Sequence, residues 1–253
     1  MAYWICAIGS SATSCRVVVA NDKLLVMRRI RDLEDFAERK HIIALPLDDG
    51  GRAAWDDYDD CYLQDLNVRL EVLGGVPIIL HWFWNSGWKE RAVLYMDMQM
   101  ELIRRELIED LKTAVVWNDR LFLCGEDVRV WQPTGWSLGP PLCRAVNSGR
   151  ALVTAVGLFV LGGRTSKGVH STWMQWLPSM EAEAWICLEC QLPAGGLDCN
   201  AWYVNGRLYF ATNNDWGSNP CWSLPILAPR EVRTSDWIQE PNIPGSFSNV
   251  FTV

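Results

Sequence analysis

The segment Val115-Val116-Trp117-Asn118-Asp119-Arg120-Leu121-Phe122-Leu123 joins two short apolar runs through a two-residue turn. The segment Ala201-Trp202-Tyr203-Val204-Asn205-Gly206-Arg207-Leu208-Tyr209-Phe210 repeats the arrangement. Asn-Asp and Asn-Gly accept the positive φ angles that a tight turn between right-twisted strands requires. Each segment is therefore predicted to form a β-hairpin.

Turns of this kind recur along the whole chain. They centre on residues 22, 75, 119, 157 and 206, a mean spacing of about 46 residues. This period is typical of the four-stranded blades of a β-propeller. We therefore expect an all-β fold and a single propeller domain over residues 1–253, with five recognisable repeats at approximately 14–64, 65–111, 112–145, 146–196 and 197–245.

A second module follows the hairpin in four of the repeats. An apolar strand runs into a proline, and a tryptophan comes after a short gap. Because proline cannot donate to a β-ladder, it is predicted to end the third strand, while the tryptophan opens the fourth and points its ring at the neighbouring sheet. The pairs are Pro46 with Trp55, Pro133 with Trp136, Pro178 with Trp185, and Pro229 with Trp237.

Two segments depart from the β pattern, and the chain ends suggest how the fold closes. Residues 32–40 and 98–112 have helix-forming composition, so each is expected to form a short helix that projects as an insertion. Residues 246–253 read as a first strand without a partner, which residues 2–8 could supply. A sixth, reduced blade closed by residues 1–13 and 246–253 is therefore an alternative to five blades.

Composition narrows the function classes. The 253 residues are 49% hydrophobic and include 15 tryptophans, enough for a large core. A net charge of −7 without a long basic run argues against nucleic acid as a partner. The sequence holds no apolar run of about 20 residues and no basic signal-peptide start, so neither a membrane span nor secretion is expected. Nine cysteines scattered in strand-like runs favour the cytoplasm or nucleus.

One repeat carries a family resemblance. Leu158-Phe159-Val160-Leu161-Gly162-Gly163-Arg164 is followed by Trp176-Leu177-Pro178 and then Trp185, which resembles a kelch repeat with its double glycine, aromatic-x-Pro and tryptophan in order. The resemblance is best over residues 112–245 and implies a kelch-type β-propeller. It goes furthest with the Kelch-like (BTB-kelch) adaptor proteins, whose BTB domain binds a cullin ubiquitin ligase. Strands begin by Cys15, so we expect the propeller half alone, without the BTB domain.

The resemblance also implies a function and a set of binding residues. In Kelch-like adaptors, which recognise ubiquitin ligase substrates, loops after the second strand hold a short substrate peptide. In this chain those loops gather aromatic and basic groups: Trp84, Trp88, Lys89, Arg164, Lys167, His170, Asp215 and Trp216. We therefore expect a monomeric, non-catalytic protein-interaction module. Lacking the ligase-binding domain, it would act as a decoy or competitive inhibitor, for example a viral one directed at a host pathway.

Two rival functions remain open. The chain could be a structural subunit of a larger assembly, or a sugar-acting propeller enzyme using Glu126, Asp127 and Asp215. Enzymes are disfavoured because the three histidines, His41, His81 and His170, fall in separate repeats.

Cys187-Leu188-Glu189-Cys190 is the only Cys-x-x-Cys motif, with Cys143 and Cys199 as candidates to complete a zinc site. Residues three apart on a strand face opposite ways, however. Neither a metal nor a cofactor is therefore predicted.

Overall fold

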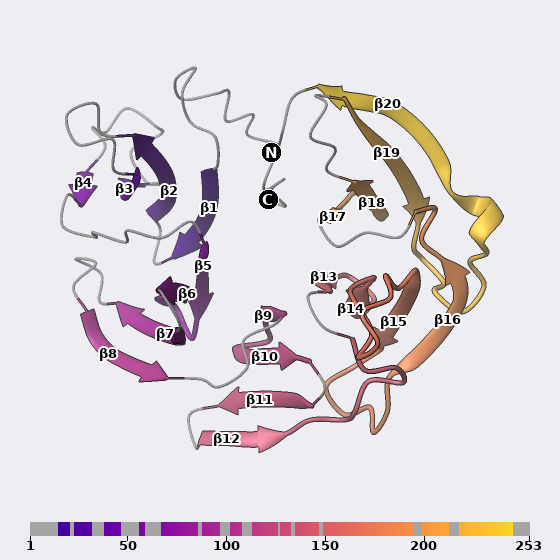
Figure 1. The fold of residues 1–253 in the computed structure, drawn as a ribbon, viewed down its shortest axis with the longest axis horizontal. Coiled ribbons are helices and arrows are strands. Elements are labelled where there is room, and N and C mark those ends of the chain that lie inside the picture. The colour runs from indigo at the N-terminus through magenta and orange to yellow at the C-terminus, as the bar shows by residue number, and fades with distance from the viewer. Residues whose placement is uncertain are drawn as a thin grey trace. The chain divides into compact units, whose positions relative to one another are not determined.

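The computed structural model shows a chain built almost entirely of antiparallel β-strands (Figure 1). It describes residues 15–20, 23–31, 38–46, 56–58, 67–85, 88–96, 102–107, 113–125, 127–132, 135–146, 149–194, 199–212 and 218–244. These residues form strands β1–β20 and one 3-10 helix, η1 (Thr234–Asp236). The chain divides into two compact units, residues 1–111 and 112–253.

The first unit contains two four-stranded sheets in which each strand pairs with the next along the chain. The first strands of the two sheets, β1 and β5, contact each other. The strands of one sheet are β1 (Cys15–Ala20), β2 (Lys23–Arg31), β3 (Glu38–Pro46) and β4 (Asp56–Tyr58). Those of the other are β5 (Asn67–Leu73), β6 (Val76–Asn85), β7 (Trp88–Met96) and β8 (Leu102–Leu107).

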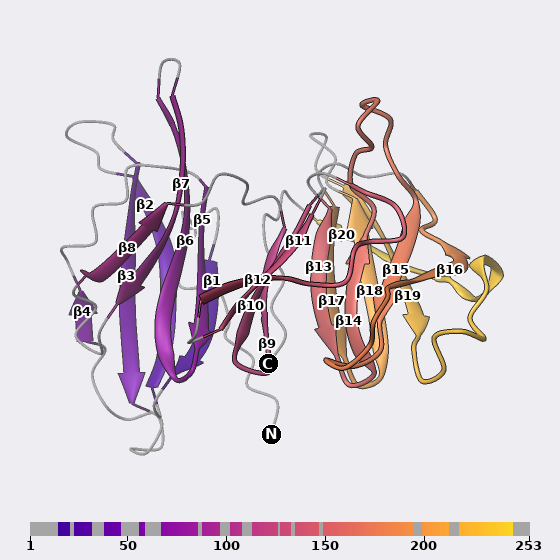
Figure 2. The same ribbon diagram turned by 90° about the horizontal axis from the view of Figure 1, so that it is seen from below.

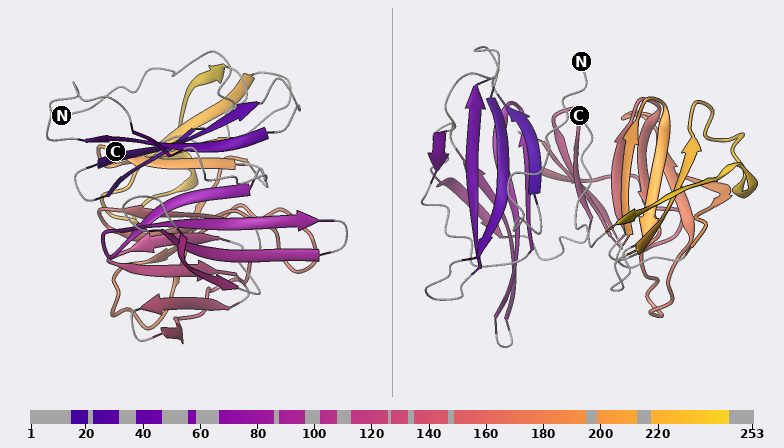
Figure 3. Two further views of the ribbon diagram at one scale, coloured as in Figure 1. Left: turned by 90° about the vertical axis from the view of Figure 1, so that its left-hand side faces the viewer. Right: turned by 90° about the horizontal axis from the view of Figure 1, so that it is seen from above.

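The second unit contains three sheets of the same topology, seen from the side in Figures 2 and 3. The first comprises β9 (Ala114–Trp117), β10 (Arg120–Cys124), β11 (Val128–Gln132) and β12 (Gly135–Leu138). The second comprises β13 (Arg150–Thr154), β14 (Gly157–Leu161), β15 (Trp173–Leu177) and β16 (Ile186–Gln191). The third comprises β17 (Cys199–Val204), β18 (Arg207–Thr212), β19 (Ser218–Pro225) and β20 (Ile238–Pro244). The first strands lie together, because β13 contacts both β9 and β17.

The hairpin turns have the backbone geometry that the sequence predicts. Asn118 and Asp119 have φ angles of 48° and 54°, and Asn205 and Gly206 have φ angles of 49° and 77°. Two successive positive φ angles are typical of a type I′ turn, whose twist matches that of the flanking strands. At Gly157, φ is 130°, and a Cβ there would collide with the carbonyl oxygen of Leu177. Only glycine fits where this turn passes the end of β15.

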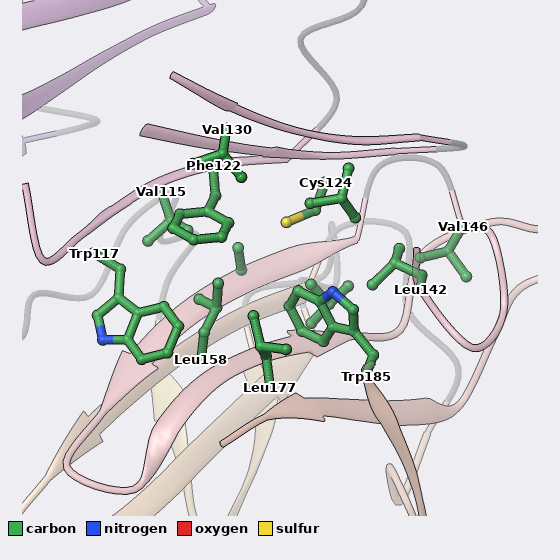
Figure 4. Close-up of a cluster of buried hydrophobic side chains, with 13 residues drawn as sticks. Val115, Trp117, Phe122, Cys124, Val130, Leu142, Val146, Leu158, Leu177 and Trp185 are labelled. Carbon is green, nitrogen blue, oxygen red and sulfur yellow. The ribbon is translucent and has the colours of Figure 1, made fainter. Parts of the chain in front are cut away.

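The middle sheet of the second unit is buried on both faces. Leu158 and Val160 of β14 belong to a core shared with β9–β11, whereas Phe159 and Leu161 of the same strand belong to a core shared with β17–β19. This alternation follows from the two-residue period of a strand. Figure 4 shows the first core, in which Val115, Phe122, Cys124 and Val130 face Leu158, Leu177 and Trp185. We call these the first and second inter-sheet cores.

Two of the predicted tryptophans link adjacent sheets, as the sequence indicates. Trp185 directly precedes β16, is only 4% exposed, and donates its indole N–H to the carbonyl oxygen of Pro140, just beyond β12, at 3.0 Å. Trp237 directly precedes β20 and donates to the carbonyl oxygen of Gln191, the last residue of β16, at 2.9 Å. The same bond therefore recurs one repeat later.

Several local predictions were wrong. Within residues 98–112 the structure places strand β8, and Glu38 to Lys40 begin strand β3, so neither described part is helical. Both segments pair with a neighbouring strand, and these ladder bonds outweigh a weak helix propensity. In the third sheet of the second unit, the strand ends at Pro225 rather than at Pro229. The proposed closure through residues 1–13 and 246–253 lies outside the described residues.

Candidate interaction site

The loop between β14 and β15, residues 162–172, carries three of the predicted binding residues. Its base is closed by backbone hydrogen bonds from Gly162 N–H to the Trp173 carbonyl at 2.9 Å and from Ser171 N–H to the Gly163 carbonyl at 2.8 Å. Gly162 and Gly163 are buried, with φ angles of 60° and 95°. The double glycine therefore bends the chain out of β14 in a conformation that side chains rarely adopt.

The outer part of this loop forms a miniature hairpin. Arg164 and His170 pair as an isolated antiparallel bridge, and Thr165 N–H donates to the Val169 carbonyl at 2.9 Å. Gly168, with a φ angle of 78°, donates to the Thr165 carbonyl at 2.8 Å and closes the tip. Figure 2 shows the loop extending beyond the ends of β14 and β15. Its own hydrogen bonds therefore give the projecting loop a defined shape.

The side chains on this hairpin are basic and accessible. Arg164, Lys167 and His170 are all exposed, and the apolar Val169 is 61% exposed. Because Arg164 and His170 are cross-strand partners, their side chains project from the same face of the short ladder. The loop thus presents a cationic surface with one apolar contact point.

A further cation lies at the base of the loop. The guanidinium carbon of Arg144 is 3.5 Å from the ring centroid of Trp173, the residue whose carbonyl holds Gly162. The main chain of Arg144 is fixed by Gln175, whose amide accepts from Arg144 N–H and donates to the Arg144 carbonyl, both at 2.9 Å. Arg144 was missed from the sequence because it is 31 residues from Gln175 and no local motif marks the pairing.

The other predicted binding residues fall into two groups. Trp84 and Lys89 are cross-strand partners at the ends of β6 and β7, and Trp88 pairs with Asn85. The structure therefore brings Trp84, Trp88 and Lys89 together on a hairpin of the first unit, with strand reaching further into the predicted loop than expected. Asp215 and Trp216 lie outside the described residues.

The two thiols of the Cys-x-x-Cys motif do not point toward a common site. Cys190 is buried in the second inter-sheet core, and Cys187 pairs across β15 with Gln175. The two thiols thus occupy opposite faces of β16, as the strand period requires. Within the part of the chain that the structure describes, no three His, Cys, Asp or Glu side chains lie close enough to hold a metal ion.

Comparison with known proteins supports the fold alone. No protein-family model matches the chain, and no curated protein matches it. A solved structure titled "Structure of YjhT" is similar over 94% of this chain and 87% of its own, with a TM-score of 0.61 and 10% sequence identity. Among the described elements, no helix is long and apolar enough to span a bilayer. With its repeated four-stranded antiparallel sheets, the chain has a β-propeller-like fold.

Proposed function

We propose that the chain is a kelch-type propeller that binds a protein partner through the loop of residues 162–172, without catalysis. The observation that carries this proposal is the hydrogen-bonded hairpin that holds Arg164, Lys167 and His170 exposed on one projecting loop. The free-energy cost of binding is lower when a loop is already ordered, because less conformational entropy is lost. A preformed loop is therefore suited to recognition.

The charge of the loop indicates the chemistry of the partner. Guanidinium and ammonium groups form strong, charge-assisted hydrogen bonds with carboxylates, so an acidic peptide segment is the favoured ligand. The protein as a whole carries a net charge of −7, which makes this basic loop a local feature rather than a general property of the surface. Val169, 61% exposed, offers an apolar contact beside these charges.

The remaining predicted residues extend the proposal. Trp84, Trp88 and Trp216 would serve as aromatic anchors, a role in which tryptophan is over-represented at interfaces, with Lys89 and Asp215 as polar contacts. A propeller that binds an adaptor's target without recruiting a ligase would compete with that adaptor. We therefore propose a decoy or inhibitor of such a pathway, acting as a monomer.

Affinity purification followed by mass spectrometry tests the proposal. The wild-type chain would be compared with a double charge-reversal variant, Arg164→Glu with Lys167→Glu, and with Arg129→Glu as a matched control. Arg129 is an exposed arginine on β11, in a different sheet from the one that carries the loop. The loop variant should bind the captured partner at least about tenfold more weakly, since each charged hydrogen bond contributes roughly 1.5–3 kcal/mol.

Other outcomes separate the alternatives. Equal capture by the loop variant and the wild type would remove the loop from the interface. A chain that is obtained only within a larger complex, and aggregates by itself in light scattering, would favour the structural-subunit function instead.

A further inference from the structure

We infer that Cys143 and Cys187 form a reversible modification site, a thiol pair that oxidises to a disulfide and ties the connector of residues 139–146 to strand β16. The connector joins β12 to β13 and so links two neighbouring sheets. This inference is independent of the proposed function, because it rests on other residues and another readout.

The first observation is the position of Cys143. It lies exposed in the connector, and its Sγ donates a hydrogen bond to the carbonyl oxygen of Trp185 at 2.8 Å. Cys187 is only two residues beyond Trp185, in β16, and is partly exposed. Cys143 is thus anchored to the strand that carries Cys187.

A second contact positions the connector independently. Gln175 of β15 is the cross-strand partner of Cys187, so the two side chains lie on the same face of the sheet. The Gln175 amide binds both main-chain groups of Arg144, the residue next to Cys143, at 2.9 Å. With its own sulfur and the next residue both held, Cys143 is brought toward Cys187, which lies close enough to raise the pKa of the Cys143 thiol.

The other described thiols are placed differently. Cys124 and Cys190 are buried in the first and second inter-sheet cores, and Cys221 is buried in β19. Among the cysteines whose side chains the structure describes, Cys143 and Cys187 alone combine solvent access with a thiol neighbour. Oxidation is therefore expected to select this pair.

The reaction balances with glutathione disulfide as the oxidant. The thiolate of one cysteine attacks a sulfur of glutathione disulfide, forming a mixed disulfide and releasing one glutathione thiol. The second cysteine then attacks the mixed disulfide and releases the other glutathione. Two cysteine thiols are oxidised, one glutathione disulfide is reduced to two glutathione molecules, and an excess of reduced glutathione reverses the process.

The environment of the pair sets its pH dependence. Burial, together with the neighbouring Cys187 sulfur, raises the pKa of Cys143 above its ordinary value. Only the thiolate attacks, so the raised pKa keeps Cys143 mainly in its protonated, unreactive form at neutral pH. Below the pKa of Cys143, the rate at which Cys143 attacks the oxidant should rise by up to about tenfold for each unit of pH.

Peptide mapping under non-reducing conditions tests the inference. The full chain would be equilibrated in glutathione buffers of graded redox ratio, free thiols blocked with iodoacetamide, and cross-linked peptides sequenced by tandem mass spectrometry. The expected product is a Cys143–Cys187 link that is lost on adding reduced glutathione. The link should be absent from Cys143→Ser and from Cys187→Ser, each of which lacks one of its two sulfurs.

The matched control is Cys190→Ser, a neighbour on the same strand whose side chain lies on the opposite face, and it should keep the link. Tryptophan fluorescence would check that each variant folds. If a variant does not fold, the peptide map of the wild-type chain still shows whether Cys143 and Cys187 are linked. Separate glutathione adducts on Cys143 and Cys187 without a link would overturn the inference. So would a link from either residue to Cys190 or Cys199, or one between two chains.

Discussion

The two inter-sheet cores of the second unit use the same tryptophan bond but support it differently. In the first core, Trp185 binds Pro140 while Gln175 and Cys143 hold the connector in place. In the second core, Trp237 binds Gln191, and the support comes from Thr234 of η1, whose hydroxyl accepts from Gln191 N–H at 2.9 Å. The first core is therefore supported by the buried amide of Gln175, and the second by the exposed hydroxyl of Thr234.

The indole hydrogen bond is common to both repeats, whereas the contacts that support it differ. Both repeats keep the indole, because its large flat ring fills the gap between sheets while its N–H donates to a backbone carbonyl of the neighbouring sheet's chain. The remaining contacts need only hold the chain that enters the next sheet, and different side chains can do so. We therefore expect the two cores to differ in how much stability each supporting contact contributes.

The largest effect is expected from removing the buried indole. Trp185→Ala should destabilise the protein by about 3–5 kcal/mol, since it leaves a cavity and an unpaired carbonyl. Trp237→Ala should cost less, because Trp237 is only partly buried. Urea unfolding measures both. Equal losses would mean that the two cores are equivalent.

A smaller effect is expected from removing the Gln175 amide, which binds the main chain of the connector at Arg144. Gln175→Leu should cost about 1–3 kcal/mol, because two hydrogen bonds to Arg144 are lost while the volume is nearly kept. Gln239→Leu, on the exposed face of β20, is the matched control and should change the free energy of unfolding little. An unchanged unfolding midpoint in Gln175→Leu would show that the tryptophan alone holds the first core.

Alkaline pH should also distinguish the cores. Burial raises the pKa of Cys124, in the first core, from 9.0 to about 12, and that of Cys190, in the second, to about 11. Above pH 9 the unfolded chain loses these protons while the folded chain keeps them, so stability falls as pH rises, by up to about 1.4 kcal/mol per unit for each group.

Urea unfolding from pH 8 to 11 would record the loss. Cys124→Ala should flatten the profile at least as much as Cys190→Ala. A profile unchanged by either substitution would show that neither thiol stays protonated in the folded state.

The smallest effect is expected from the exposed support of the second core. Thr234→Ala removes the hydroxyl that accepts from Gln191 N–H and should cost about 0.5–1.5 kcal/mol. Ser235→Ala, on the same 3-10 helix, serves as the control. A loss larger than that of Gln175→Leu would reverse the order of the two supports.

Local patterns predicted the parts of the fold that depend on neighbours in sequence. Asn118-Asp119 and Asn205-Gly206 marked their turns because few residues accept positive φ, and the tryptophans before β16 and β20 followed from their spacing after the third strand. The loop residues Arg164, Lys167 and His170 could be selected because the double glycine precedes them. The helix predictions failed because composition alone does not reveal strand pairing, as β8 shows.

The period, the hairpin turns and the strands that flank those turns follow from the sequence alone, since each depends on the conformational preferences of adjacent residues. Tertiary packing sets which groups meet: Arg144 lies over Trp173, Gln175 binds the connector, and the Cys143 thiol donates to the carbonyl of Trp185. These partners are about 30 to 45 residues apart, and they meet only after whole sheets have packed face to face. Contacts of that range leave no local pattern to detect.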